Sequence, residues 1–292
     1  MEDFASKWKY RLSQDSLTDY AHVVDEAMDA ICSELSSNQI TNETADIDFS
    51  SFTPQQELNP KIWPNGKINS RVRLKLLDIS DDFFKTLKID WLKPLDVLLT
   101  GSMANYNWSK YSDFDLHLLL DFSDVDENVD FVHEYFTAKK KLWNEEHENL
   151  MIYGFPVEVY VQNIDENLVS NGIYSLYKNK WVIEPSKDNI KGLGQDKDTI
   201  KSKAVETMKK IDALYNATFD INHGYDGEKL LAQIQKLITI IKGVRKQSLA
   251  KGGEMAAGNI FFKILRRTGY IEKLFNAKTL SYDSKESIYS FF

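Results

Sequence analysis

The sequence is poor in the residues that stabilise small disulfide-rich or fibrous scaffolds: it has one cysteine, six prolines and thirteen glycines among 292 residues. The single cysteine, Cys32, excludes an intramolecular disulfide framework and a zinc or iron–sulfur site built from cysteines. No run of about 18 apolar residues occurs, so we expect no membrane span. The first residues are acidic and precede no apolar segment, so we expect no signal peptide. These absences predict a cytoplasmic protein.

Charge is unevenly distributed along the chain. The whole sequence has a net charge of −8, but residues 201–292 hold 16 basic and 9 acidic residues, which leaves the first 200 strongly acidic. An acidic body repels long duplex nucleic acid and anionic membranes, so neither is an expected partner. The basic final third is compatible with a phosphate-rich small molecule or an RNA end, although solvated helix faces are the commoner origin of such charge.

The spacing of apolar residues predicts an α/β (α+β) fold with a helical end. A short mixed sheet with flanking helices should occupy residues 61–195. An N-terminal helix and a polar loop should pack on it over 1–60, and a helical C-terminal region should cover 196–292. The individual elements predicted are helices over 17–35, 68–89 and 124–150, strands over 96–100, 114–122 and 156–162, and helices from about 198 with breaks near 222–224 and 252–253.

One segment concentrates residues with chemical potential. Gly101 and Ser102 follow an apolar strand, and we expect them to open a helix. A turn of this kind aims backbone N–H groups and a hydroxyl at a bound phosphate. Asp113 and Asp115 are two residues apart at the start of the next strand, which places both carboxylates on one face. Glu158 lies opposite the valines of the strand 156–162. If these strands are neighbours, three carboxylates converge, and such clusters hold Mg²⁺ or Mn²⁺.

This ordered set resembles the DNA polymerase beta-like nucleotidyltransferase superfamily, in a branch with uncharacterised phage or bacterial members. The motif there is an apolar strand, Gly-Ser, a spacer of about ten residues, Asp-apolar-Asp, and a third acid on a later strand; Gly101, Ser102, Asp113, Asp115 and Glu158 match it. Many members carry Asp where this chain has Glu158, and the longer side chain leaves open whether Glu158 is a metal ligand, the base on the attacking hydroxyl, or both. The resemblance implies Mg²⁺-dependent transfer of a nucleotide from an NTP with release of pyrophosphate. We expect two-metal phosphoryl transfer, in which Asp113 and Asp115 bind both ions. A phage-encoded member would act in the host cytoplasm.

Further residues are candidates for nucleotide contacts. The resemblance implies that a lysine of the helical region contacts the triphosphate. Lys263 lies there with Asn259 and Arg266 on the expected polar side of an apolar helix. Ser112 precedes the first acid, so its hydroxyl is a candidate for touching phosphate, with turn capping the commoner role. His117 shares the acidic face of its strand, either supporting a carboxylate or as a packed histidine.

The sequence leaves the acceptor and one alternative function open. The acceptor hydroxyl can belong to a small molecule, a second nucleotide, a protein or an RNA end. The alternative is a catalytically inactive nucleotide-binding or protein-interaction module with the same fold, which the intact set of acids disfavours.

Overall fold

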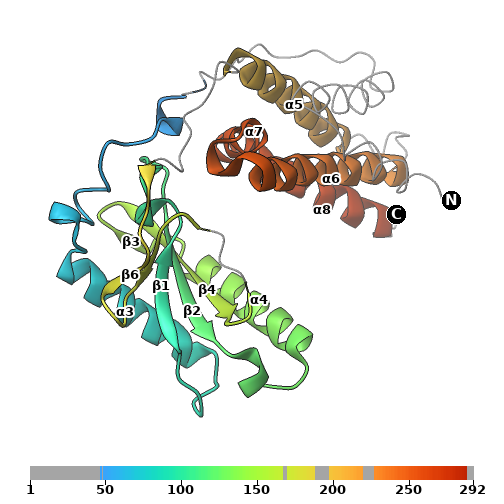
Figure 1. Ribbon diagram of the computed structural model, residues 1–292. Coiled ribbons are helices and arrows are strands. Elements are labelled where there is room, and N and C mark those ends of the chain that lie inside the picture. Colours follow the sequence, from blue (N-terminus) through green and yellow to red (C-terminus); the bar gives the residue numbers. More distant parts are fainter. Residues whose placement is uncertain (1–46, 48, 167–169, 188–196, 220–226, 288–292) are drawn as a thin grey trace. The chain divides into compact units, whose positions relative to one another are not determined.

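The computed structural model describes residues 47, 49–166, 170–187, 197–219 and 227–287. The helix predicted over 17–35 lies outside these residues. The chain divides into two compact units (Figure 1), of which one spans residues 48–192 and the other contains residues 193–292. Each unit is described by itself below.

In the part of the first unit that the structure describes, six strands form one mixed sheet in the order β3-β4-β2-β1-β5-β6. β2 is parallel to β4 and antiparallel to β1, and the remaining neighbours, β1–β5, β3–β4 and β5–β6, are antiparallel. The strands are β1 (Asp96–Thr100), β2 (Phe114–Leu120), β3 (Met151–Ile152), β4 (Phe155–Asn163), β5 (Ile173–Ser175) and β6 (Lys180–Ile183). The strand pair β2–β4 therefore brings residues 113–115 beside residues 157–158.

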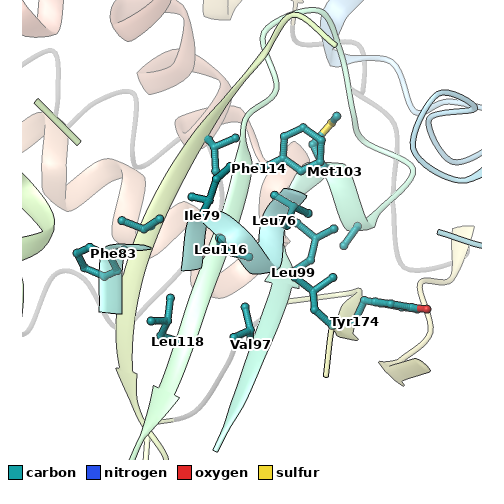
Figure 2. Packing of buried hydrophobic residues seen from close by; sticks show 14 of the residues in the cluster. Leu76, Ile79, Phe83, Val97, Leu99, Met103, Phe114, Leu116, Leu118 and Tyr174 are labelled. Atoms are coloured by element: carbon teal, nitrogen blue, oxygen red, sulfur yellow. The ribbon is translucent and has the colours of Figure 1, made fainter. Parts of the chain in front are cut away.

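Helices α3 (Ser70–Thr86) and α4 (Val129–Glu146) supply the apolar layer against this sheet. Each is preceded by an N-cap asparagine, Asn69 or Asn128, whose side chain accepts a hydrogen bond from a backbone N–H of the first turn. Figure 2 shows side chains of α3 gathered with those of β1 and β2 in one cluster of buried residues. Among the labelled members are Ile79, Phe83, Val97, Leu99, Phe114, Leu116 and Leu118.

The alternation of residues along β2 and β4 separates this core from a polar face. Every second residue of β2, from Phe114 to Leu120, is buried, whereas the residues between them are half-buried. Since side chains of successive residues point to opposite faces of a sheet, the acids of β2 and β4 lie on the face away from the core cluster.

The described residues of the second unit form four α-helices: α5 (Lys197–Ala217), α6 (Gly227–Gly252), α7 (Ala257–Arg267) and α8 (Tyr270–Glu286). α6 packs on α7 and α8, and α5 packs on the same two helices. Gly258 permits the close approach of α7 to α6, because an added Cβ would lie 2.8 Å from a methyl carbon of Val244.

The structure shows a mixed α/β fold with C-terminal helices, in agreement with the predicted fold class. The predicted strands over 96–100, 114–122 and 156–162 appear as β1, β2 and β4. The turn at Gly101 and Ser102 opens only a single 3₁₀ turn, Ser102–Ala104, where the sequence suggested a helix. The short strands β3, β5 and β6 were not predicted from the sequence. Among the described residues, no helix is long and apolar enough to span a membrane.

Candidate functional site

Three carboxylates come together where β2 and β4 run side by side. Asp115 and Glu158 are register partners on the parallel strands, and Asp113 immediately precedes β2. Each of the three half-buried residues offers one carboxylate oxygen, and these oxygens lie within 4.8 Å of one another. The structure therefore brings together the three acids that the sequence singled out, in an arrangement of hard oxygen donors that suits a divalent cation.

Gly101 lets the backbone after β1 approach this cluster closely. Its φ of +69° and ψ of −155° lie in a region that is essentially restricted to glycine. A Cβ at this position would lie 1.8 Å from Oδ2 of Asp115, well inside any contact distance. Glycine is thus required at this position for two reasons: only glycine readily adopts this backbone conformation, and a side chain would overlap the Asp115 carboxylate.

A serine network shapes the loop between β1 and β2. The hydroxyl of Ser102 donates to Oγ of Ser112 at 2.8 Å, and Oγ of Ser112 also accepts from the backbone N–H of Ser109 at 2.9 Å. Ser109 and Ser112 are both buried. These hydrogen bonds fix the position of the Ser102 hydroxyl, so Ser112 has a structural role in the loop. The predicted contacts of Gly101, Ser102 and Ser112 with a nucleotide stay predictions.

Tyr160 is a further neighbour of the acids, and the sequence analysis did not predict it. It lies two residues after Glu158 on β4, hence on the same face, and its hydroxyl donates to Oε2 of Glu158 at 2.6 Å. Burial raises the pKa of Tyr160, and the carboxylates of Asp115 and Glu158 raise it further. The phenol therefore stays protonated at neutral pH and remains a hydrogen-bond donor.

His117 packs against Tyr160 on the polar face of the sheet. The two residues are register partners on β2 and β4, and their rings stack with centroids 4.7 Å apart and planes 11° apart. Nδ1 of His117 lies 2.7 Å from Oε1 of Gln162, and it carries the proton because that amide oxygen can only accept. Burial lowers the pKa of His117 to about 4, and the nearby ammonium of Lys140 contributes, so the ring is neutral at pH 7. Its polar partner is thus an amide and not a metal-ligating carboxylate.

Lys140 reaches the same cluster from α4, which runs along the edge of β4. The backbone N–H of Val159 donates to the side-chain amide oxygen of Asn144, which fixes the helix beside the strand. The ammonium of Lys140 lies 3.6 Å from the centroid of the Tyr160 ring. Burial lowers the pKa of Lys140, and the carboxylates of Glu158 and Asp115 oppose that shift. Lys140 therefore places a positive charge within electrostatic reach of the acids.

The two candidates in the helical region have different surroundings. Lys263 is one-fifth exposed and forms an ion pair with Glu254 of its own unit. Partial burial raises the pKa of Glu254, but the charge and hydrogen bond of Lys263 outweigh that effect and hold it below the ordinary value. Asn259, expected on the polar side of α7, is fully buried and donates to the backbone carbonyl of Glu254 at 2.7 Å. Arg266 is exposed. The predicted contact of Lys263 and Arg266 with a triphosphate stays a prediction.

Tyr160 and Lys140, which both lie near the acids, differ in how far the sequence could have predicted their positions. The period of two that placed His117 beside the acids also applies to Tyr160, so that signal was present. Lys140 carried no such signal, because its position depends on α4 lying along the free edge of β4. β3 covers only Phe155 and Pro156 of that edge.

Comparisons with known proteins add no relative. The chain matches no protein-family model, no curated protein and no solved structure.

Proposed function

We propose that this protein is a Mg²⁺- or Mn²⁺-dependent nucleotidyltransferase that transfers an NMP from an NTP to an acceptor hydroxyl and releases pyrophosphate. The observation that carries the proposal is the cluster of Asp113, Asp115 and Glu158 on neighbouring strands, directly beside the Gly101–Ser102 turn. The sequence order of these residues resembles the DNA polymerase beta-like nucleotidyltransferases, and the folded arrangement supports that assignment.

The donor set fits a hard divalent cation. All three side chains offer carboxylate oxygens, and no cysteine or histidine belongs to the group. When bound, such a cation neutralises the triphosphate and favours attack at the α-phosphorus. Asp113, just before β2, and Asp115, within it, would hold it from one side, and Glu158 would hold it from β4.

The other residues of the turn have a role in holding the nucleotide. Gly101 has no side chain to exclude a phosphate from the backbone, and the hydroxyl of Ser102 is held in place by Ser112. An acceptor oxygen then forms a bond to the α-phosphorus while the bond to the pyrophosphate oxygen breaks. The proton of the acceptor hydroxyl leaves to a carboxylate of the site or to water.

The test is the fate of the α-phosphate. The full chain is incubated with each of the four NTPs, labelled at the α-phosphate, in Mg²⁺ with pools of candidate acceptors: aminoglycosides, nucleotides, RNA ends and protein substrates. We expect metal-dependent release of pyrophosphate and label in a product, both lost in the variant with Asp113→Asn and Asp115→Asn. Nucleotide binding without turnover over all acceptors would support the inactive-module alternative instead. Turnover that survives the double substitution would place the chemistry elsewhere.

A further inference from the structure

We infer that Tyr160 is the positioning residue for Glu158: its hydroxyl holds Oε2 of Glu158 and thereby fixes that carboxylate beside Asp113 and Asp115. This inference rests on the proposed function, because it assumes that the three acids hold a cation. It assigns Tyr160 no contact with nucleotide or acceptor.

The hydrogen bond itself is short and directed. The Tyr160 hydroxyl donates to Oε2 of Glu158 at 2.6 Å, in the range of hydrogen bonds from a hydroxyl to a charged carboxylate. Tyr160 and Glu158 are separated by one residue on β4, so the strand holds both side chains on one face. Glutamate has one more rotatable bond than aspartate. A fixed partner on one oxygen restricts rotation about this additional bond of Glu158. The shorter side chains of Asp113 and Asp115 have fewer rotatable bonds and need less restriction.

The Tyr160 ring is itself held from two sides. His117 comes from β2, the neighbour of β4 on one side, and stacks on the ring; Gln162 fixes that imidazole at 2.7 Å. Lys140 comes from α4, along the other edge of β4, and places its ammonium 3.6 Å from the ring centroid. A cation over an aromatic ring at this distance is attracted to it. The hydroxyl is thus aimed at Glu158 by contacts from two different elements.

A ligand positioned in this way should lose affinity for the cation when its support is removed. Loss of a hydrogen bond to a ligating side chain typically reduces metal affinity by about 10–100-fold. Tyr160→Phe keeps the ring and its contacts with His117 and Lys140 and deletes only the hydroxyl. We therefore expect weaker Mn²⁺ binding by on the order of tenfold or more, with the thermal stability of the metal-free protein nearly unchanged.

The experiment measures Mn²⁺ binding to the full chain by electron paramagnetic resonance, without nucleotide, so that activity is not the readout. Tyr153→Phe, which removes the hydroxyl of a half-exposed tyrosine in the β3–β4 turn, is the matched control and should bind Mn²⁺ as the wild type does. In a Glu158→Gln background, Tyr160→Phe should cause no further loss, because the carboxylate that it positions is gone. A loss that persists undiminished in that background would show that Tyr160 acts on the fold and not through Glu158.

The outcomes separate this inference from the proposed function. If the wild type binds Mn²⁺ and Tyr160→Phe binds it equally well, Tyr160 does not position Glu158 and the inference is overturned, while the metal site stands. If the wild type binds no Mn²⁺, the proposed function fails and takes the inference with it. Should Tyr160→Phe not fold, His117→Leu removes the ring that stacks on Tyr160 and leaves the charge beside the acids unchanged at pH 7, and unchanged Mn²⁺ affinity in that variant overturns the inference.

Discussion

Replacing Gly101 by alanine tests the close approach of the loop to the acids. The glycine has a φ of +69°, and holding a non-glycine residue in this region costs about 1–3 kcal/mol. For a unit of about 150 residues, each kcal/mol lowers Tm by about 2–4 °C. We therefore expect Gly101→Ala to lower the Tm of the metal-free protein by about 2–12 °C.

The same substitution should damage the site more than the fold. The added Cβ would lie 1.8 Å from Oδ2 of Asp115, whereas ordinary contact begins at 3.4 Å, so the carboxylate or the loop must move by about 1.6 Å. A displacement of about 1 Å at a reacting site can cost about 100-fold in rate. We expect Mn²⁺ affinity, measured by electron paramagnetic resonance, and the rate of NTP turnover each to fall by about 100-fold or more.

Gly154→Ala is the matched control for this prediction. Gly154 has a φ of +85° in the β3–β4 turn, but an added Cβ there meets nothing within 4 Å. Its left-handed backbone should cost about 1–2 kcal/mol without touching the acids. Stability should fall in both variants and metal binding in Gly101→Ala alone. Equal Mn²⁺ affinities of the two variants would refute the reasoning.

Three further perturbations probe the site, the sheet and the helical unit. Millimolar Mg²⁺ should raise the Tm of the wild type relative to EDTA by binding to the folded state alone, and the variant with Asp113→Asn and Asp115→Asn should show no such rise in calorimetry. Asp96 is buried and accepts the hydrogen bond of the Ser175 hydroxyl, whose oxygen lies 2.8 Å from both carboxylate oxygens, so Asp96→Ala should cost about 1–3 kcal/mol in urea unfolding and leave Mn²⁺ affinity unchanged. Because the pKa of Glu254 is held below its ordinary 4.5, it adds stability above that pH that is lost as the pH falls, and Glu254→Gln should flatten the acid limb of a stability–pH curve.

The elements that carry the acids were predictable because their patterns are local. The alternation of residues in β4 placed Glu158 on the face opposite the valines, and the apolar run of β1 ended directly before Gly101. The short strands β5 and β6 were not predictable in this way, since β5 has only three residues, all buried, and shows no alternation. The support around Glu158 depends on tertiary structure: Lys140 meets Tyr160 only because α4 lies along the edge of β4. Asn259 was misplaced for the same reason, because its burial follows from the packing of α7 and not from its polarity.

The central claim, that Asp113, Asp115 and Glu158 form the cation site of a nucleotidyltransferase, is tested most directly by locating Mn²⁺ in crystals. Crystals of the full chain are grown with Mn²⁺ and an NTP analogue that resists cleavage between the α- and β-phosphates, and the metal is found from its anomalous scattering. The account predicts Mn²⁺ coordinated by oxygens of all three acids, with the triphosphate bound to it beside Gly101 and Ser102. Mn²⁺ and triphosphate bound together at any other set of residues, or an acid cluster that binds neither, would contradict it.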